Sequence, residues 1–485
     1  MTTTHIVHYN GATAKSQSVI ASLARDSVEN SEAVTIIDIG RTTTIKQGFP
    51  PKRWAQLLGH TLFETAMQDI PDPLGVAMVP LPNSSQRATV KPEDLAALEQ
   101  ALESELLTYF RLDHIPKSAE ARALSQLLRS AMMDTYTALT ELWSQTRPDR
   151  VLIPNGRTSR QKVARLVAKQ MGLDIFLYEN GRASPDSYYL GRTQPHDRVA
   201  SQQEILDGFP LPQGAALEAV ADTWLTHRMA GSAGTNQFSD QWAPASTPLR
   251  TGATDNLTAV FFASSFDEFL AFGPMWTIDE WSHQFEAFDR IMSILEDRGV
   301  DLVLRLHPNL GTKSRQYFLR EVRDILALQD RHPSLEIHWH NEPTNSYDLV
   351  KNADYVIVER STIGLEASLM GKPVWVTQAA QWDMVADVRQ VLRPTDISEE
   401  ALEPWDASPL GAQNFVAYWM AQEKPLHYNW QTWASWDPEK APLRMKVAQL
   451  TVNNPWRHKK RLLSLEWAKW RNSRFTPPSR KSENK

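Results

Sequence analysis

Three short segments carry side chains that could act on a phosphorylated substrate. His307 and Pro308 follow the apolar run "LVLRL", Ser361 and Thr362 begin "STIGLEAS", and Glu179 follows "IFLY". A histidine can donate a hydrogen bond to a phosphate oxygen or act as an acid, and hydroxyl groups at a helix start bind phosphate beside free backbone N–H groups. A carboxylate at the end of a buried strand can act as general base for a hydroxyl. These side chains indicate transfer chemistry on a nucleotide-activated donor.

The segment around Ser361 predicts a strand, a helix and a second strand. Asp354–Glu359 is a short β-branched run, Ser361 is a helix-capping residue type, and the helix should cover about 362–370. Gly371 supplies a left-handed residue after the helix, and Val374–Val376 restarts a strand. A helix that begins at the carboxyl end of a parallel strand directs its N–H groups and positive dipole end into a crevice, which favours phosphate binding.

Neighbouring residues extend this candidate donor site. Arg305 and Pro308 lie at the end of the preceding strand. Gly364 would let a ligand or a neighbouring strand approach closely, and Glu366, on the same helix face as Thr362, could accept hydrogen bonds from ribose hydroxyls. The alternative interpretation is an ordinary loop histidine and a capped structural helix with one exposed glutamate.

A second candidate group lies earlier in the chain. The loops after Val151–Ile153 and Ile175–Tyr178 contain Asn155, Gly156, Arg157, Gly181 and Arg182. Because the carboxyl ends of parallel strands meet at one sheet edge, both loops should lie there with Glu179 as base. Gly181 would permit close approach of a substrate, and the two arginines could hold an anionic group. The alternative is a pair of turns whose Asn-Gly sequences serve backbone geometry alone.

Strand-like and helix-like segments alternate along most of the chain. Strands are expected at 6–8, 34–39, 258–263, 301–306 and 335–338, and helices at 93–112, 119–146, 159–171, 277–298, 314–329 and 347–351. This alternation predicts an α/β protein with two Rossmann-like domains, each built on a parallel sheet, and a ligand cleft between them. The expected limits are an acceptor-side domain at 1–235, a linker at 236–256, a nucleotide-donor domain at 257–440, and a C-terminal helix with a basic tail at 441–485.

Composition narrows the class of protein. The chain has 485 residues and no Cys, so it is long enough for two domains and can form neither disulfides nor a thiolate metal site. Neither a secretory signal nor a run of about 18 apolar residues can be read from the sequence. The expectation is a cytoplasmic protein.

Charge is unevenly distributed. Residues 456–485 hold ten basic and two acidic residues, a net charge of +8, which leaves −14 on the rest because the whole chain carries −6. An acidic body argues against nucleic-acid binding. The tail segment Trp456–Phe475 aligns its indoles on one helix face among Lys and Arg. Two interpretations are open: packing across the domains, or attachment to the inner face of an anionic plasma membrane.

Taken together, the motifs resemble those of bacterial capsule polysaccharide biosynthesis glycosyltransferases, a group that includes Kdo transferases and polysialyltransferases. The resemblance rests on an acidic-x-Gly motif at Glu179–Gly181, a His-Pro motif at His307 and a Ser/Thr motif at Ser361, in matching order across about 152–376. It implies the two-domain GT-B architecture, an inverting transfer without bound metal or other cofactor, and a nucleotide-sugar donor, often a CMP-sugar. Asn180 departs from the commoner pattern, in which a second acidic residue stands there.

By this resemblance Glu179 matches the catalytic base, while His307, Ser361 and Thr362 match donor contacts. The acceptor would be a surface polysaccharide or a glycolipid. The chain lacks an Asp-x-Asp tripeptide, the usual carboxylate clamp for a divalent ion, which agrees with metal-free transfer.

Three alternatives share this fold. A polymer glycerophosphotransferase using CDP-glycerol would differ in its donor. A nucleotide-sugar epimerase usually carries Ser-Gly-Gly where this chain has Ser361, Thr362 and Ile363. A non-catalytic binding protein would keep the fold without turnover.

Overall fold

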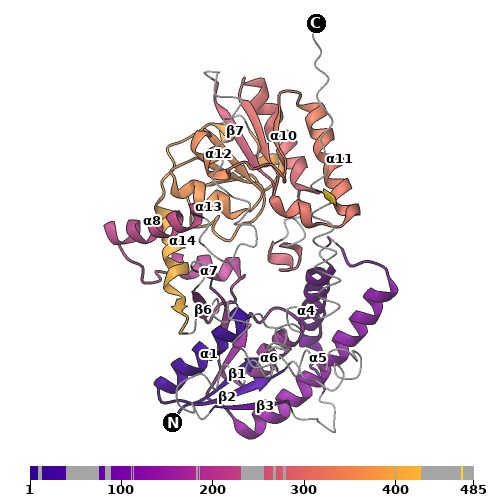
Figure 1. Cartoon of the computed structure of the whole chain (residues 1–485), viewed down its shortest axis with the longest axis vertical. Helices are drawn as coiled ribbons and strands as arrows, with labels where there is room; N and C mark the ends of the chain where they lie inside the picture. Colours follow the sequence, from indigo (N-terminus) through magenta and orange to yellow (C-terminus); the bar gives the residue numbers. More distant parts are fainter. Residues whose placement is uncertain are drawn as a thin grey trace, which may run out of the picture.

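The structure is a computed structural model with two lobes, stacked vertically in Figure 1. It describes residues 1–8, 14–39, 76–81, 89–110, 112, 114–181, 184, 186–230, 256–265, 269–276, 280–398, 400–427 and 471–472. Nearly all of the expected linker, and nearly all of the expected C-terminal helix and tail, lie outside the described residues. Within the described part of the chain, none of the helices has the length and hydrophobicity of a membrane-spanning segment.

The first lobe is built on a seven-stranded sheet in the order β13-β6-β5-β4-β1-β2-β3. Its strands are β1 (Thr3–His8), β2 (Ala33–Asp38), β3 (Ala77–Pro80), β4 (Arg150–Pro154), β5 (Asp174–Asn180), β6 (Ser187–Gly191) and β13 (Glu423–Pro425). Its helices are α1 (Ala14–Glu29), α4 (Pro92–Phe110), α5 (Ala119–Thr146) and α6 (Ser159–Gln170). Alternate strand residues face opposite layers: Val7 and Val151 pack with α4, α5 and α6, whereas Ile6 and Leu152 pack with α1.

The second lobe is built on a six-stranded parallel sheet in the order β12-β11-β10-β7-β8-β9. Its strands are β7 (Thr258–Phe262), β8 (Asp301–Arg305), β9 (Glu336–His338), β10 (Tyr355–Val358), β11 (Val374–Val376) and β12 (Arg389–Gln390). Its helices are α10 (Gln284–Asp297), α11 (Arg315–Arg331), α12 (Ser346–Asn352), α13 (Thr362–Leu369) and α14 (Leu410–Ala421), with short 3-10 turns at η2 (Pro274–Trp276), η3 (Pro308–Thr312), η4 (Pro394–Asp396) and η5 (Glu400–Leu402). Helices α10 and α11 cover one face of this sheet, and α12, α13 and α14 cover the other.

Both sheets have the strand order of a Rossmann domain. Counted in chain order within each lobe, the first six strands stand as 6-5-4-1-2-3, so the order reverses between β1 and β4 and again between β7 and β10. At one edge of the first sheet, β6 pairs antiparallel with β5, and β13 pairs antiparallel with β6. The predicted fold class, two Rossmann-like α/β domains, is confirmed. In sheets with this order, ligands bind beyond the carboxyl ends of the strands at the reversal, here β1 and β4 in the first lobe and β7 and β10 in the second.

The chain crosses between the lobes more than once. Helices α7 (Arg198–Leu206) and α8 (Ala215–Met229) precede the expected linker, yet α7 lies between the lobes and α8 packs on α13 and α14 (Figure 1). After α14 the chain returns, and β13 pairs with β6 of the first sheet. The domain limits given above therefore stay a prediction.

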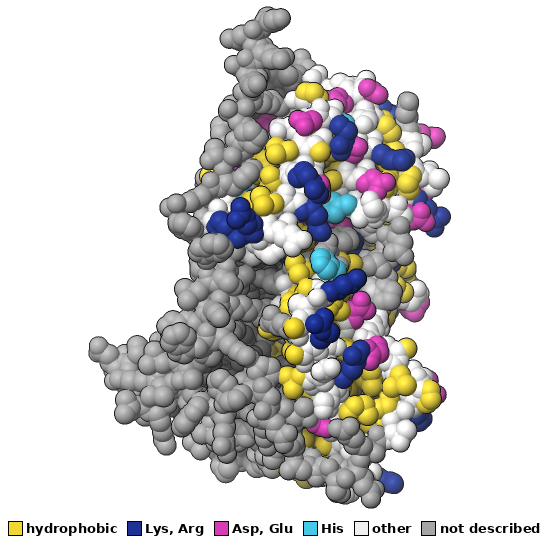
Figure 2. All heavy atoms as spheres, turned by 90° about the vertical axis from the view of Figure 1, so that its right-hand side faces the viewer, with side chains coloured by type: hydrophobic (Ala, Val, Ile, Leu, Met, Phe, Trp, Pro, Cys, Tyr) yellow, Lys and Arg dark blue, Asp and Glu magenta, His cyan; other side chains and the backbone are white. Residues whose placement is uncertain are grey.

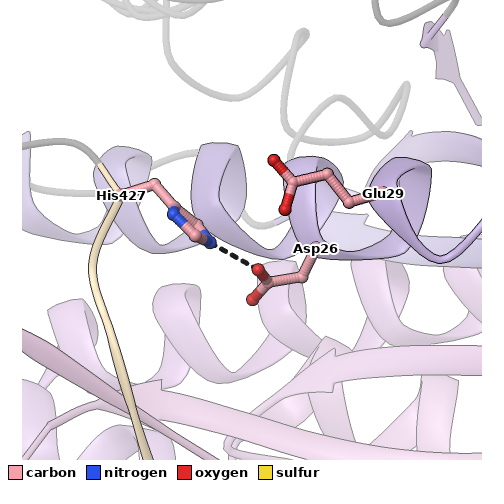
Figure 3. Close-up of side chains that lie close together, drawn as sticks. All are labelled: Asp26, Glu29 and His427. Atoms are coloured by element: carbon pink, nitrogen blue, oxygen red, sulfur yellow. Dashed lines mark hydrogen bonds and ion pairs between the residues drawn. The ribbon is translucent and has the colours of Figure 1, made fainter.

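A cluster of ionisable groups holds the returning chain to α1. His427 pairs with Asp26 beside Glu29 (Figure 3). A ring nitrogen of His427 and one carboxylate oxygen from each acidic residue lie within 4.8 Å of one another. Asp26 also accepts a hydrogen bond from Tyr188, and Glu29 pairs with Arg25 at 2.6 Å. Ion pairing accounts for this cluster.

On the flank shown in Figure 2, Lys and Arg side chains follow one another down the face of both lobes. Acidic and histidine side chains lie among them, so the described part of this face presents a mixed charge pattern. A surface that binds nucleic acid would instead gather one sign of charge.

Candidate functional site

A cavity of about 240 Å³ opens at the carboxyl edge of the second sheet. Its wall is built from residues that follow β7, β8 and β10, at the point where the strand order reverses. The predicted donor-site residues that line it are Arg305, His307, Pro308, Ser361, Thr362 and Glu366. Segments separated by some 50 residues in sequence thus meet at one place because parallel strands end at a common edge.

Helix α13 begins at this cavity, as the sequence predicted. Ser361 is its N-cap, and the side chain accepts a hydrogen bond from the backbone N–H of Ile363 at 3.5 Å. Gly371 after the helix has a left-handed φ of +70°. The first N–H groups of α13 and the positive end of its dipole therefore lie at the cavity wall, an arrangement that favours an anion.

Gly364 serves close packing in this structure. A Cβ atom at Gly364 would lie 2.6 Å from Cη2 of Trp382 and 2.8 Å from Cγ2 of Val358 in β10. The absence of a side chain lets α13 approach its own strand and Trp382. Gly364 is not among the residues that line the cavity.

His307 is oriented by its own loop. Its Nδ1 accepts a hydrogen bond from the backbone N–H of Asn309 at 3.0 Å, so the proton of the neutral ring is on Nε2. Burial, together with the positive charges of Lys313 and Arg305, lowers the pKa of His307 to about 3. At neutral pH the ring is uncharged, and its chemistry is that of a hydrogen-bond donor rather than of a general acid.

Arg305 lines the cavity and also stabilises a neighbouring loop. Its guanidinium donates to the carbonyl oxygen of Trp339 at 2.5 Å and, at longer distances, to those of His338, Glu342 and Thr344. These bonds order the loop that leads from β9 into α12. Burial lowers the pKa of Arg305 to about 10, so the side chain remains a cation at neutral pH.

Glu366 is held by an arginine that the sequence analysis did not name. Arg228 of α8 donates to Oε1 of Glu366 from Nη2 at 2.7 Å and from Nε at 3.0 Å, and to the hydroxyl of Thr362 at 3.3 Å. Both partners are buried, with 8 % and 1 % of their side-chain surfaces exposed. Any ribose contact made by Glu366 would therefore be shared with Arg228.

A second buried pair was also missed, although its residues adjoin the Ser361 motif. Arg360 lines the cavity, pairs with the fully buried Glu359 at 3.2 Å, and donates to the backbone carbonyl of Trp276. Its guanidinium stacks 4.9 Å from the ring centroid of Phe269, which also lines the cavity. The signal available in the sequence was the "ER" dipeptide at the end of the strand.

Several buried donors at the cavity wall lack partners among the described residues. They are Ser264 Oγ, Arg305 Nε, Arg360 Nε and Trp382 Nε1. Buried polar groups in native proteins are nearly always hydrogen-bonded, so these donors are exceptions. The four atoms have almost no accessible surface, so they lie beneath the cavity wall rather than on it.

The N-terminal candidates form a separate group. Strands β4 and β5 are parallel, with Pro154 opposite Tyr178, so their two loops share one sheet edge as expected. The side-chain amide of Asn155 donates to Oε2 of Glu179 at 2.7 Å. Asn155 and Gly156 both have left-handed φ angles, 50° and 74°. Asn155, Gly156 and Glu179 do not line the cavity of the second lobe.

Arg157 and Gly181 make contacts that differ from those expected. Arg157 donates to the carbonyl of Ala271 in the second lobe at 2.8 Å instead of facing an open cleft. Gly181 lies against β6, where an added Cβ would meet the backbone carbonyl of Ser187 at 2.5 Å. The close approach that this glycine allows is therefore made by β6. Arg182 lies outside the described residues.

No family model matches the chain, and no curated protein was found to be similar to it. Solved structures with similar folds include the Thermosulfurimonas dismutans KpsC beta Kdo 2,4 transferase, with 17 % identity, coverage of 56 % of this chain and 80 % of that one, and a TM-score of 0.34. They also include the calicheamicin glycosyltransferase CalG4, with 12 % identity, coverage of 96 % of this chain and 98 % of that one, and a TM-score of 0.26. A third is the Methanocaldococcus jannaschii UDP-GlcNAc 2-epimerase in complex with UDP-GlcNAc and UDP, with 11 % identity, coverage of 86 % of this chain and 98 % of that one, and a TM-score of 0.32.

The similar structures thus include a Kdo transferase, from the group named by the motifs, and other glycosyltransferases. They also include epimerases, one of the alternatives. Similarity at these identities and TM-scores is too low for an argument about activity. The function therefore has to be inferred from the site.

Proposed function

We propose that the chain is an inverting, metal-independent glycosyltransferase that moves a sugar from a nucleotide donor, with a CMP-sugar as first choice, to a surface polysaccharide or glycolipid. The observation that carries this proposal is the cavity at the switch point of the second sheet. It combines a neutral histidine donor, a capped helix N-terminus and buried arginines. That set suits a phosphate group.

In the proposed reaction an acceptor hydroxyl attacks the anomeric carbon and the bond from that carbon to the phosphate oxygen breaks. The phosphate gains negative charge as it leaves. The Nε2–H of His307, the first N–H groups of α13 and the hydroxyls of Ser361 and Thr362 would stabilise that charge. Fixed donors in a buried site stabilise developing charge more strongly than water does.

Glu179 is proposed as the base that takes the proton of the acceptor hydroxyl. Its carboxylate is oriented by the amide of Asn155 and by its neighbour's backbone N–H at 3.0 Å. It belongs to the first lobe, and the donor cavity to the second. An acceptor bound between the lobes would bring its hydroxyl to the carboxylate.

A nucleotide screen tests the proposal. Thermal unfolding of the intact protein is followed with CMP, CDP, UDP, GDP and CDP-glycerol, because a ligand at a hundred times its Kd adds about 2.7 kcal/mol to the free energy of unfolding. His307→Ala and Ser361→Ala should each weaken binding of the best nucleotide by about 1.5–3 kcal/mol, or roughly 10- to 150-fold. The exposed His114 provides a control, His114→Ala. Unchanged affinity in both cavity variants would reject the site, and a preference for CDP-glycerol would favour the glycerophosphotransferase.

The setting of the enzyme is part of the proposal. A polymer or lipid acceptor would suit a cytoplasmic enzyme at the inner face of the membrane, with residues 456–485 as the contact. One described tail residue favours packing instead: Asn472 is buried and donates to the carbonyl of Gly311 at 2.9 Å. Sedimentation with anionic vesicles at low and high salt separates the two, since binding lost at high salt indicates the membrane contact and no binding at low salt indicates packing.

A further inference from the structure

One short segment of the second lobe touches both candidate groups. Residues 269–276, here named the strap, follow the strand β7 and include the turn η2. Phe269 and Trp276 of the strap line the donor cavity. Phe272, between them, packs against Arg157 of the first lobe and against His196, which precedes α7, with the His196 and Phe272 ring centroids 4.2 Å apart.

The contacts around the strap are made mainly to backbone carbonyl groups. Arg157 and Ser104 both donate to the carbonyl of Ala271, and the guanidinium of Arg157 lies 4.8 Å from the ring centroid of Phe272. Near α7, the indole of Trp276 donates to the carbonyl of His196 at 2.8 Å, and Arg198 donates to the carbonyl of Met275 at 2.8 Å. Arg157 is two residues from Asn155, which holds Glu179.

The second lobe holds the same strap independently. Arg360 donates to the carbonyl of Trp276 and stacks on Phe269. Arg360 is fixed in turn by Glu359 at the end of β10. The strap is thus held by the partly buried Arg157 from the first lobe and the buried Arg360 from the second, with Arg198 of α7 as a third contact at Met275.

We infer that Arg157 is a positioning residue, which sets the spacing between the Glu179 loop and the donor cavity by holding the Ala271 carbonyl and the Phe272 ring. The inference rests on the proposed function for its catalytic consequence, but the spacing itself is a property of the free protein. Burial lowers the pKa of Arg157 to about 10, so the group remains a cation that needs its carbonyl, hydroxyl and ring partners. Arg360, by contrast, lines the donor cavity directly, so its substitution should act mainly on donor binding.

Interdomain distance is the direct test. The chain has no Cys, so cysteines placed at the exposed Lys169 and Asp297, one in each lobe, would carry a donor and acceptor dye pair without background labelling. In the free protein, Arg157→Gln should broaden or shift the distance distribution, and Arg157→Lys should do so less. The control is Arg192→Gln, which removes an arginine that also stacks on a ring, Phe176 at 4.4 Å, but within the first lobe. Identical distributions for wild type and both Arg157 variants would overturn the inference.

Turnover provides a second, separable readout. With CMP-Kdo and UDP-GlcNAc as donor probes, Arg157→Lys should lower kcat by tenfold or more while KM for the donor changes less than threefold. Arg360→Lys should show the opposite split, with KM raised. A change of KM alone in Arg157→Lys would overturn the inference. If the wild type bound and turned over neither probe, the proposed function would fail, and the distance measurement would still decide the role of Arg157.

Discussion

The buried ion pair between Arg228 and Glu366 at the cavity wall should be costly to break on one side. Arg228 reaches Glu366 from a helix that precedes the expected linker, at 2.7 Å and 3.0 Å. Burial by itself would lower the pKa of Arg228, but Glu366 and Tyr347 together outweigh that effect and raise it. Each charge therefore depends on the other for its solvation.

The magnitude follows from that dependence. Arg228→Met leaves a carboxylate that is 1 % exposed without its cation, and loss of one partner of a buried pair costs about 3–5 kcal/mol. For a cooperative unit of 150–250 residues this corresponds to a fall in Tm of about 6–20 °C. Glu366→Leu should cost a similar amount, because it leaves the buried guanidinium unpaired. The double variant Arg228→Met/Glu366→Leu removes both charges and should be more stable than either single variant.

The assay is urea unfolding of the four proteins at pH 7.5, followed by tryptophan fluorescence and circular dichroism. A control cycle is available in the exposed pair Arg129 and Glu99, at 2.6 Å, with side chains 53 % and 58 % exposed. That pair should couple by less than about 1 kcal/mol. If the two Arg228 and Glu366 destabilisations simply add in the double variant, the two groups are not paired as described and the reasoning is refuted.

Three further outcomes are expected. Glu179→Gln should lower kcat by roughly 10²–10⁴-fold with nucleotide affinity intact, whereas an equal loss of folding and binding would make Glu179 structural. Because the pKa of His307 is lowered from 6.5 to about 3, the unfolded chain takes up a proton that the folded one does not, so stability should fall as pH drops below about 6.5 and fall less in His307→Gln; equal slopes in urea unfolding would contradict this. Gly364→Ala should destabilise by about 1–3 kcal/mol through the contact with Trp382, and Trp382→Phe should relieve part of that cost; no relief would place the strain elsewhere.

Local signals in the sequence predicted much of the fold. The helix expected at 119–146 has those limits in the structure, because the side chain of Ser118 caps it by accepting from Ala121 N–H at 3.0 Å. The strand expected at Val374–Val376 is also found as predicted. Such ends are decided by a few neighbouring residues, which a sequence displays directly.

Helix α8 was not predicted, and it shows why local sequence signals are insufficient. Its buried residues Leu217, Ala221, Trp224 and Arg228 have helical spacing, so the periodic signal was present. The fourth of them is an arginine, which reads as a solvent-facing residue. It is buried because Glu366, 138 residues later, meets it. A charge that is buried by a distant partner has no local signature.

Some contacts of the candidate site could likewise be predicted from the sequence, and others could not. Strand ends brought His307, Ser361 and Thr362 to one cavity, because the alternating pattern implies parallel strands, which end at one edge of the sheet. The sequence also placed Asn155 beside Glu179 on one sheet edge. Contacts between the lobes, such as that of Arg157 with the strap, depend on how two domains meet, which no segment encodes alone.

The charges around the cavity set how much negative charge a donor can bring. Arg228 is neutralised by Glu366 and Arg360 by Glu359, while His307 is uncharged at neutral pH. Among the cavity-lining groups of the described residues this leaves Arg305, whose hydrogen bonds go to carbonyl groups and whose charge is stabilised by the nearby Glu342. One positive charge offsets the charge of one phosphate group, and a second uncompensated charge would be costly in a low-dielectric site. A diphosphate sugar carries such a second charge, and so does a CMP-sugar with a carboxylate on its sugar, so either donor needs a further cationic or hydrogen-bonding partner. The nucleotide screen, rather than this charge balance, therefore ranks the donors.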